Sequence, residues 1–556
     1  MKESYLGTES SPAGESYPAG ESYPAGESSP AGESYPAQVT ALSARQKRNI
    51  LIAMCTALIA VVASVSGLNV AQREIAESLG ASAGDVLWII NAYTLALAAL
   101  LMPIGAIGDR WGRRPVLLGG LAVFAVASVG AALAPSVGVM IAARTLAGVG
   151  AAMVMPVTLS VITTSFPPEE RPRAIGIWAG FSGAGGILGL WMASIMVDLV
   201  DWRWLFTLPI LMIVVSAVMA WRSVPNSRES HGSFDKVGSV LSALAIGGLV
   251  FGVHEGPEKG WGHALATYPI LIGAVALVAF VVWELRTERP LLDVRAFANR
   301  GLASGTLTIT LLFSTMFGIF LVLFPFLQTV LGWSAIHSAF AMMPMAVVMM
   351  PMSASAPRIA QRIGHRTTML TGLGIGIVGL SMLALMASVE GGYMSILPGL
   401  LILGFGVGMT MTPATEAITA TLPAEQQGVA SALNDTSREL GGAVGVALLG
   451  SILTAGYSSR VADFVSGLPG QLSMLGSDYF TDLGAAQQIG ASDPSLAARI
   501  VDAAQHAYVA SWSSTMWVGV AVLAVAFVYV AVAGPRTAIV EAPLPGAEPE
   551  PEMVTA

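Results

Sequence analysis

The sequence predicts an all-α integral membrane protein with about fourteen transmembrane helices. Hydrophobic residues make up 54% of the 556-residue chain and charged residues only 11%, and the mean hydropathy is +0.69. This is more apolar surface than a soluble core can use, so the bilayer is the expected solvent. Apolar runs of ~20 residues, long enough to cross a bilayer as a helix, recur along the chain between short polar turns.

The basic residues predict the orientation of these spans. The first span is expected near residues 50–71 and the last near 510–532. Lys and Arg are retained on the cytoplasmic side during insertion, and most of them lie inside if both termini are cytoplasmic. The outside segments then contain Arg73, Arg203, Lys259, Arg460 and Arg499. This pattern requires an even number of spans, which favours fourteen over thirteen or fifteen.

Three polar segments lie outside the predicted spans. Residues 1–49 carry ESSPAG and ESYPAG repeats without apolar periodicity and are expected to form a disordered cytoplasmic tail. Residues 534–556 are acidic and proline-rich and are expected to form a second such tail. Residues 457–505 are expected to form an extracytoplasmic loop before the last span, either a solvated connection or one with short amphipathic helices.

Several functional classes find no support in the sequence. The net charge of −8 is spread over loops and tails, so no nucleic-acid partner is expected. Phosphate-binding loops, dinucleotide fingerprints and Ser-His-Asp arrangements are not found, and the six His are scattered. Cys55 is the single cysteine, so no disulfide can form within the chain. The sequence therefore predicts neither an enzyme nor a bound cofactor or metal.

A tract with the sequence GAIGDRWGRRPVLL separates two long apolar runs. Its glycines allow close helix approach and a sharp turn, and its Asp can meet a helix N-terminus or an Arg on a neighbouring helix. A loop that only anchors the chain by positive charge would need the basic residues alone. The tract resembles the G-x-x-x-D-R-x-G-R-R gating motif of the major facilitator superfamily. The matching residues are Gly105, Asp109, Arg110, Gly112, Arg113 and Arg114.

The resemblance extends from about residue 50 to 535 and implies the organisation of the chain. A degenerate copy of the tract, APRIAQRIGHRTTM, lies between spans ten and eleven, the corresponding place in the second half. The resemblance implies a major facilitator fold with six-helix bundles at 50–222 and 301–533. Two extra helices within 237–286 would join them, as in the fourteen-helix drug:proton antiporter branch of the EmrB and QacA type.

Two further tracts are similar to motifs of that branch. Arg144, in RTLAGVGAA, lies deep in the fourth span, where a charge costs ~2.5–3.5 kcal/mol on insertion scales and needs a partner or a wet cavity. The resemblance implies a part in proton transfer, and a structural bond to carbonyl groups is the alternative. Gly185 and Gly189 match a helix-packing motif of the fifth span. Leu190 replaces its proline, which removes a kink expected to resist leakage.

Carboxylates are missing at three positions where the cationic-drug branch can carry them. Ser64, Asn91 and Met349 occupy the matching places in the first, second and tenth spans. A lipophilic cation at the midplane needs a carboxylate to offset its desolvation. Neutral or weakly acidic amphiphiles are therefore favoured over quaternary ammonium compounds as substrates.

The densest intramembrane polarity lies in the thirteenth span. Asp435, Arg438 and Glu439 are spaced to share one helical face. Burial and the neighbouring Arg act in opposite directions on a carboxyl group's affinity for a proton, and exposure to alternate sides of the membrane changes their balance. One carboxyl group, Asp435 by preference, is predicted to bind the transported proton. The alternative is a self-neutralising ion pair that locks this helix to its neighbours.

The substrate cavity is predicted in outline from polar and aromatic residues on inward helix faces. The candidates are Asn91, Tyr93, Trp178, Phe317, Phe324 and Asn434. The leading hypothesis is a proton-coupled exporter of an amphiphilic antibiotic or secondary metabolite in the plasma or inner membrane. An uncoupled facilitator or importer of a small metabolite, and a non-transporting receptor or platform, are the alternatives. The expected partners are the substrate, protons and the lipid bilayer, and the sequence implies no oligomeric state.

Overall fold

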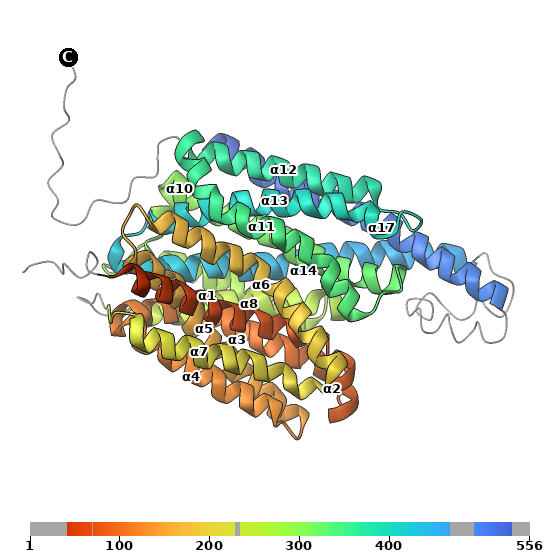
Figure 1. Ribbon diagram of the computed structural model, residues 1–556, viewed down its shortest axis with the longest axis horizontal. Helices are drawn as coiled ribbons and strands as arrows, with labels where there is room; N and C mark the ends of the chain where they lie inside the picture. The colour runs from red at the N-terminus through yellow and green to blue at the C-terminus, as the bar shows by residue number, and fades with distance from the viewer. Residues whose placement is uncertain (1–41, 69, 228–233, 467–493, 536–556) are drawn as a thin grey trace, which may run out of the picture. The chain divides into compact units, whose positions relative to one another are not determined.

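The computed structural model describes residues 42–68, 70–227, 234–466 and 494–535. Within these ranges fourteen helices are long and apolar enough to cross a membrane, which confirms the predicted number (Figure 1). Residues 1–41 and 536–556, which make up most of the two predicted tails, lie outside the described residues.

Six of the helices pack together as an N-terminal bundle. They are α1 (Ala44–Leu68), α3 (Ala83–Trp111), α4 (Arg113–Ala132), α5 (Val137–Ser165), α6 (Arg171–Leu199) and α7 (Thr207–Ser223). The short helix α2 (Gln72–Leu79) and the 3-10 turn η2 (Trp202–Phe206) pack on apolar side chains at the ends of α1, α3 and α5. Leu97 and Phe124 are among the fully buried residues of this bundle.

Six later helices form a C-terminal bundle. They are α10 (Arg300–Pro325), α11 (Ala335–Ile363), α12 (His365–Met386), α13 (Gly392–Thr419), α14 (Gln427–Ser466) and α17 (Pro494–Ala533). Short helical turns precede or continue three of them. These turns are η3 (Val294–Ala298), η4 (Phe326–Val330) and η5 (Ala424–Gln426).

The two remaining helices, α8 (Lys236–Lys259) and α9 (Ala264–Glu284), form a hairpin. Small residues bring their backbones together: a Cβ atom on Gly252 would lie 2.7 Å from the carbonyl oxygen of Ala266. Through Val250, α8 packs between Ala98 of α3 and Ala443 of α14, one residue from each bundle. Large apolar side chains of α9 are exposed, as expected for a helix that faces lipid.

The helix ends differ from the predicted boundaries at three places. Helix α1 begins at Ala44, inside the tail predicted for 1–49. Helices α14 and α17 are 40 residues long each. They include 457–466 and 494–505 from the predicted loop 457–505, whose remaining residues 467–493 lie outside the described ranges. Alanine favours helix, and four of the residues 494–505 are alanines, so α17 begins before the apolar run that marked its span.

The two halves of the chain use the same turn at equivalent places. Gly112 joins α3 to α4 with φ 107°, and Gly364 joins α11 to α12 with φ 86°. Only glycine adopts such angles without steric cost. The degenerate second copy of the tract thus repeats the turn of the first.

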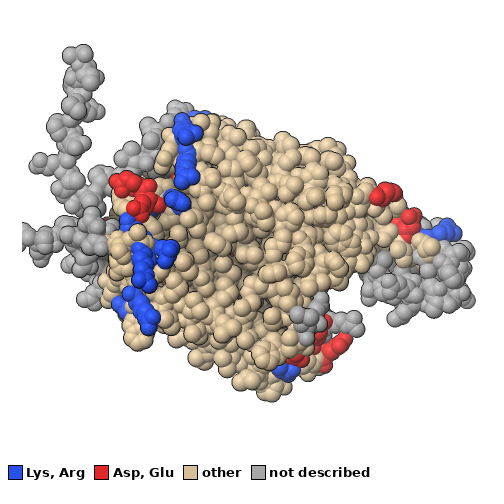
Figure 2. All heavy atoms as spheres, in the orientation of Figure 1, with Lys and Arg blue, Asp and Glu red and all other residues tan. Residues whose placement is uncertain are grey.

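Basic side chains gather at one end of the helices. Figure 2 shows Lys and Arg near the end where α1 begins, next to a broad uncharged band. We call this the basic end. It is defined by Arg45, Arg48, Arg110, Arg114 and Arg173. An uncharged band bordered by basic residues on one side is typical of a membrane protein with that side in the cytoplasm.

Candidate functional site

The carboxylate of Asp109, near the end of α3, lies against the N-terminus of α14. Its two oxygens accept hydrogen bonds from the amide of Gly428 at 2.8 Å each, and Oδ2 accepts another from the amide of Val429 at 3.2 Å. Asp109 is only 5% exposed. The unpaired amides and the positive end of the helix dipole favour a carboxylate at this place. A side chain of the N-terminal bundle therefore caps a helix of the C-terminal bundle.

Arg113, the first residue of α4, completes this contact. Its fully buried guanidinium donates to Asp109 Oδ1 from Nη2 at 2.8 Å and from Nε at 3.2 Å. Nη2 also donates to the carbonyl oxygen of Ala424, just before α14, at 3.2 Å. Hydrogen bonds to charged groups contribute ~1.5–3 kcal/mol each. We call Asp109, Arg113, Ala424 and Gly428 the clasp, and it holds the two bundles together at the basic end.

Two glycines of the motif make room for the clasp. A Cβ atom on Gly105 would lie 2.6 Å from the carbonyl oxygen of Gly428, so α3 and α14 meet with their backbones in contact. At Gly112 a Cβ atom would lie 2.8 Å from Asn226 Oδ1, in addition to the positive φ. Both positions therefore exclude a side chain.

The two other arginines of the motif lie at the same end. Arg114 Nη2 donates to the carbonyl oxygen of Trp221 at 2.6 Å and so ties α4 to α7 inside the N-terminal bundle. Arg110, near the end of α3, is half-buried. The motif thus combines contacts within one bundle and contacts between the bundles.

Glycines on two faces of α6 allow it to pack against two helices at once. Gly185 and Gly189 face α1, and a Cβ atom on Gly189 would lie 2.5 Å from Ala63 Cα. Gly176 faces α11 of the other bundle, where a Cβ atom would lie 2.7 Å from the carbonyl oxygen of Ser353. Helices α6 and α11 therefore form a second seam between the bundles, besides that of α3 and α14.

A polar cluster on α14 lies buried at the junction of the bundles. Arg438 Nη1 donates to Asp435 Oδ1 at 3.2 Å, and Asn434 Nδ2 donates to the same oxygen at 3.4 Å. Asn434 Oδ1 accepts a hydrogen bond from Thr415 of α13 at 3.2 Å, and Glu439 is half-buried one residue beyond Arg438. Asp435 Oδ2 and Arg438 Nε have no hydrogen-bond partner among the described residues. Unsatisfied buried atoms of this kind are costly unless another group binds them.

Aromatic side chains from both bundles flank the cation of this cluster. The guanidinium of Arg438 lies 4.6 Å from the ring centre of Phe313 on α10 and 5.8 Å from that of Trp178 on α6. Trp178 Nε1 donates to Thr158 Oγ1 on α5 at 3.0 Å, which fixes the indole. Phe313 and Thr158 were not predicted as site residues, because no local pattern links them to Arg438 or Trp178.

A second fully buried arginine, Arg144, lies within the N-terminal bundle. Its Nη1 donates to Ser64 Oγ at 3.1 Å, and its Nε donates to the carbonyl oxygen of Ile89 at 3.3 Å. The guanidinium covers the ring of Tyr93 at 4.4 Å from the ring centre. Tyr93 is buried as well and donates its hydroxyl hydrogen to the carbonyl oxygen of Val61 at 3.0 Å. Arg144 therefore contacts a carbonyl oxygen, a serine hydroxyl and an aromatic ring, all of them neutral.

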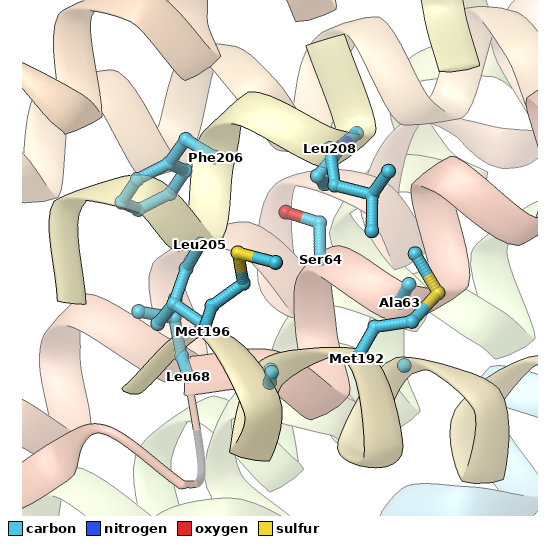
Figure 3. Close-up of a pocket in the computed structure, with 12 residues that line it drawn as sticks. Ala63, Ser64, Leu68, Met192, Met196, Leu205, Phe206 and Leu208 are labelled. Atoms are coloured by element: carbon cyan, nitrogen blue, oxygen red, sulfur yellow. The ribbon is translucent and has the colours of Figure 1, made fainter. Parts of the chain in front are cut away.

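Ser64 also lines a small cavity between α1, α6, η2 and α7. Figure 3 shows its hydroxyl directed into the space between Phe206, Leu208 and Met196. The other walls are apolar apart from backbone atoms, and the space suffices for about one water molecule. Of the residues predicted from the sequence, Gly189 and Ser64 line this cavity.

The remaining predicted cavity residues are spread along the helices. Tyr93 belongs to the Arg144 site, whereas Trp178 and Asn434 belong to the cluster on α14. Phe317 lies on α10 with its ring centre 6.0 Å from that of Phe313. The side chains of Asn91 on α3 and Phe324 on α10 are half-buried.

Two helix bundles that meet at a clasp, with buried charges at their junction, are typical of a membrane transporter. The family description "Major Facilitator Superfamily" matches residues 52–446. The chain belongs to this superfamily, and it is a multi-pass membrane transporter for small molecules. In the described ranges no three His, Cys, Asp or Glu side chains come together as a metal site would need.

Relatives of known activity match most of the chain. "Multidrug efflux pump LfrA" of Mycolicibacterium smegmatis is 35% identical over 437 residues, 78% of this chain and 86% of that protein. "Cephamycin export protein CmcT" of Amycolatopsis lactamdurans is 32% identical over 425 residues, 75% of this chain and 87% of that protein. "Tetracenomycin C resistance and export protein" of Streptomyces glaucescens is 32% identical over 418 residues, 74% of this chain and 76% of that protein. These relatives are transporters, not enzymes.

Solved structures confirm the predicted major facilitator fold. The proton:xylose symporter XylE has a TM-score of 0.56 at 13% identity, with 89% of this chain and 97% of that chain covered. A bacterial homologue of the lysosomal transporter Spinster has a TM-score of 0.54 at 16% identity, with 88% and 98% covered. At such low identity the likeness concerns the fold alone.

Proposed function

We propose that this protein exports an amphiphilic small molecule, such as an antibiotic or secondary metabolite, across the plasma membrane in exchange for protons. Relatives that match about three quarters of the chain are named for multidrug efflux and antibiotic export. The observation that carries the proposal is the buried cluster of Asp435, Arg438 and Glu439 at the junction of the bundles. Carboxyl groups at such a place can take up a proton on one side and release it on the other.

The contacts between the bundles indicate how proton binding would drive the movement. Trp178 of the N-terminal bundle lies over Arg438 of the C-terminal bundle, so rocking of the bundles changes the surroundings of Arg438 and Asp435. A proton on Asp435 removes the charge that binds Arg438 and thereby shifts the balance between the two orientations. The clasp at Asp109 opens and closes the basic end in the same cycle.

An Asp435→Asn variant is expected to lose substrate-driven proton movement, by roughly ten-fold or more, because its amide cannot carry a proton through the cycle. The full-length protein would be reconstituted in vesicles with an imposed pH gradient, and proton flux recorded on addition of neutral, anionic and cationic amphiphiles. Glu255→Gln is the matched control. Glu255 is buried on α8 and pairs with Lys259 at 2.8 Å, but it lies outside the cluster. Its substitution is expected to leave proton flux unchanged, and equal losses in both variants would contradict the role of Asp435.

Uncoupled facilitation is the second candidate, and it rests on α6 and Ser64. Helix α6 continues past Leu190, whose carbonyl oxygen accepts a hydrogen bond from the Ser194 hydroxyl at 2.8 Å, where the antiporter motif has a proline. Ser64 occupies the place of an acid and binds Arg144. Substrate movement that ignores both the pH gradient and Asp435→Asn would favour facilitation over antiport.

Both termini are proposed to be cytoplasmic, and single-cysteine labelling tests this. Cys55 is buried in α1 and would be replaced by alanine. Ser43, just before α1, and Asp502, near the start of α17, are both exposed positions for a new cysteine. In intact cells a membrane-impermeant maleimide is expected to label Asp502→Cys and to label Ser43→Cys only after the membrane is opened. The reverse pattern would overturn the orientation.

A further inference from the structure

We infer that the exported substrate carries an anionic group and that Arg144 is the counter-ion that recognises it. This inference rests on the proposed export function and adds the chemical class of the substrate. Three features support it: the neutral partners of Arg144, the position of Ser64 beside this arginine, and the cavity into which the Ser64 hydroxyl points.

Arg144 is a buried cation whose partners are all neutral. It binds a serine hydroxyl, a backbone carbonyl oxygen and a tyrosine ring. No acidic side chain pairs with it in the described part of the chain, and its Nη2 has no hydrogen-bond partner there. Arg438 provides the contrast, because it is equally deep in the protein but binds the carboxylate of Asp435 at 3.2 Å. The carboxylates of that cluster lie on α14, in the other bundle. Glu439 is near enough for its charge to act on Tyr93, but it forms no ion pair with Arg144.

A buried guanidinium without a carboxylate is an unfavourable arrangement that an incoming anion relieves. Charge-assisted hydrogen bonds between guanidinium and carboxylate are among the stronger polar contacts in proteins. Arg144 does not itself line the cavity beside Ser64, so its unpaired Nη2 becomes a donor to such a group when the cavity widens. A quaternary ammonium group would meet the same positive charge as a repulsion.

Ser64 connects this cation to the cavity. Its oxygen accepts the hydrogen bond from Arg144, so its own hydroxyl hydrogen remains available to donate to an anion. The hydroxyl points into the cavity, whose other walls include the side chains of Met192, Met196 and Leu205 (Figure 3). An anionic head beside Ser64 would thus have an apolar body against these walls. The cavity is narrow in this conformation, and flexible methionine side chains are suited to widening it.

The membrane potential gives a physical reason why an anion suits this protein. A cell interior that is negative by 100 mV drives a monovalent anion outward by a factor of about 50 at equilibrium. An anion is therefore exported with less help from protons than a cation. A serine in place of the acid near Arg144 and an uninterrupted α6 are compatible with this lower demand for coupling.

Binding to the solubilised full-length protein tests the inference without any transport step. The probes share a naphthyl body: 1-naphthylacetate, 1-naphthaleneethanol and (1-naphthylmethyl)trimethylammonium. Wild type is expected to bind the carboxylate at least ~10-fold more tightly than the alcohol, and the ammonium most weakly. Ser64→Asp supplies Arg144 with a counter-ion and is expected to abolish the advantage of the carboxylate. Ser64→Ala leaves the charge of Arg144 in place but removes the Ser64 donor, so the advantage of the carboxylate is expected to shrink without being lost.

Ser66→Asp is the matched control for added charge. Ser66 lies two residues further along α1, and its hydroxyl donates to the carbonyl oxygen of Val62 at 3.5 Å rather than binding Arg144. The carboxylate preference is expected to survive this substitution. If Ser64→Asp does not fold, Arg144→Gln replaces it, with the same loss of preference expected.

Three outcomes separate this inference from the proposed function. Equal binding of all three probes by wild type overturns the anionic substrate class, even if proton-coupled flux of other amphiphiles is observed. A carboxylate preference that Ser64→Asp and Arg144→Gln leave intact overturns the role of Arg144. A preference lost in both variants supports the inference, whether or not flux in vesicles depends on the pH gradient.

Discussion

Replacing Asp109 with alanine is expected to lower the free energy of unfolding by about 3–5 kcal/mol, because it takes the Asp109 carboxylate away from a buried arginine. Arg113 is fully buried and has Asp109 as its acidic partner at 2.8 Å. The same substitution removes the acceptor for the amides of Gly428 and Val429 at the start of α14. Thermal unfolding in detergent measures the loss of stability, and transport in vesicles is expected to fall below detection.

Two comparisons isolate the buried charge as the cause. Asp109→Ala combined with Arg113→Met removes both charges and is expected to regain most of the stability but not the transport, since the clasp stays broken. Asp201→Ala serves as the control. Asp201 also accepts a hydrogen bond from a backbone amide at the start of a helical turn, at 2.8 Å, but it is exposed. Asp201→Ala is expected to lower the free energy of unfolding by about 1 kcal/mol. A wild-type melting temperature for Asp109→Ala would contradict the clasp.

A leucine at Gly105 is expected to prevent closure of the basic end. A Cβ atom there would lie 2.6 Å from the carbonyl oxygen of Gly428 and 2.7 Å from Ala432 Cβ, so α3 and α14 must separate. Ser431 on α14 is buried in the wild-type protein and reports this separation when it is replaced by cysteine in a Cys55→Ala background. Alkylation of this cysteine from the side of the basic end is expected to be faster by roughly ten-fold or more, as for a site released by local opening.

Gly138→Leu is the control for adding the same side chain to a membrane helix. A Cβ atom on Gly138 would have no neighbour within 4 Å among the described residues. This variant is expected to alkylate at the wild-type rate and to transport. If Gly105→Leu also alkylated at the wild-type rate and transported, the contact between α3 and α14 would not control closure of the basic end.

Hydropathy and basic residues predicted the number of the helices because these features act through the bilayer and not through particular contacts. The sequence left open whether residues 457–505 form a solvated loop or contain helices, and α14 and α17 both extend into this segment. The outer turns of α17 are alanine-rich and those of α14 mix polar and apolar residues. Hydropathy cannot distinguish such helices from a solvated loop. The start of α1 at Ala44 was missed in the same way, because Arg45 and Arg48 read as tail although they continue the helix.

The sequence predicts which residues belong to the candidate site, but not how their side chains are arranged. Asp435 and Arg438 are three residues apart on one helix, so their ion pair follows from helical spacing. The burial of Arg113 does not, because its partner Ala424 lies 311 residues away in the chain. The Trp178 to Arg438 contact depends likewise on how two bundles meet. Contacts between helices distant in sequence require the three-dimensional structure.

The hairpin of α8 and α9 separates one of the two seams between the bundles from the lipid. Val250 of α8 rests on Ala98 and Ala443, so the hairpin covers the seam between α3 and α14. Substrates of amphiphilic character dissolve in the bilayer and can reach a transporter sideways from a leaflet. On the α3 side such a molecule meets the hairpin first. We therefore expect lateral entry, if substrates use it, at the seam between α6 and α11, where the ring centres of Trp191 and Phe340 lie 5.7 Å apart.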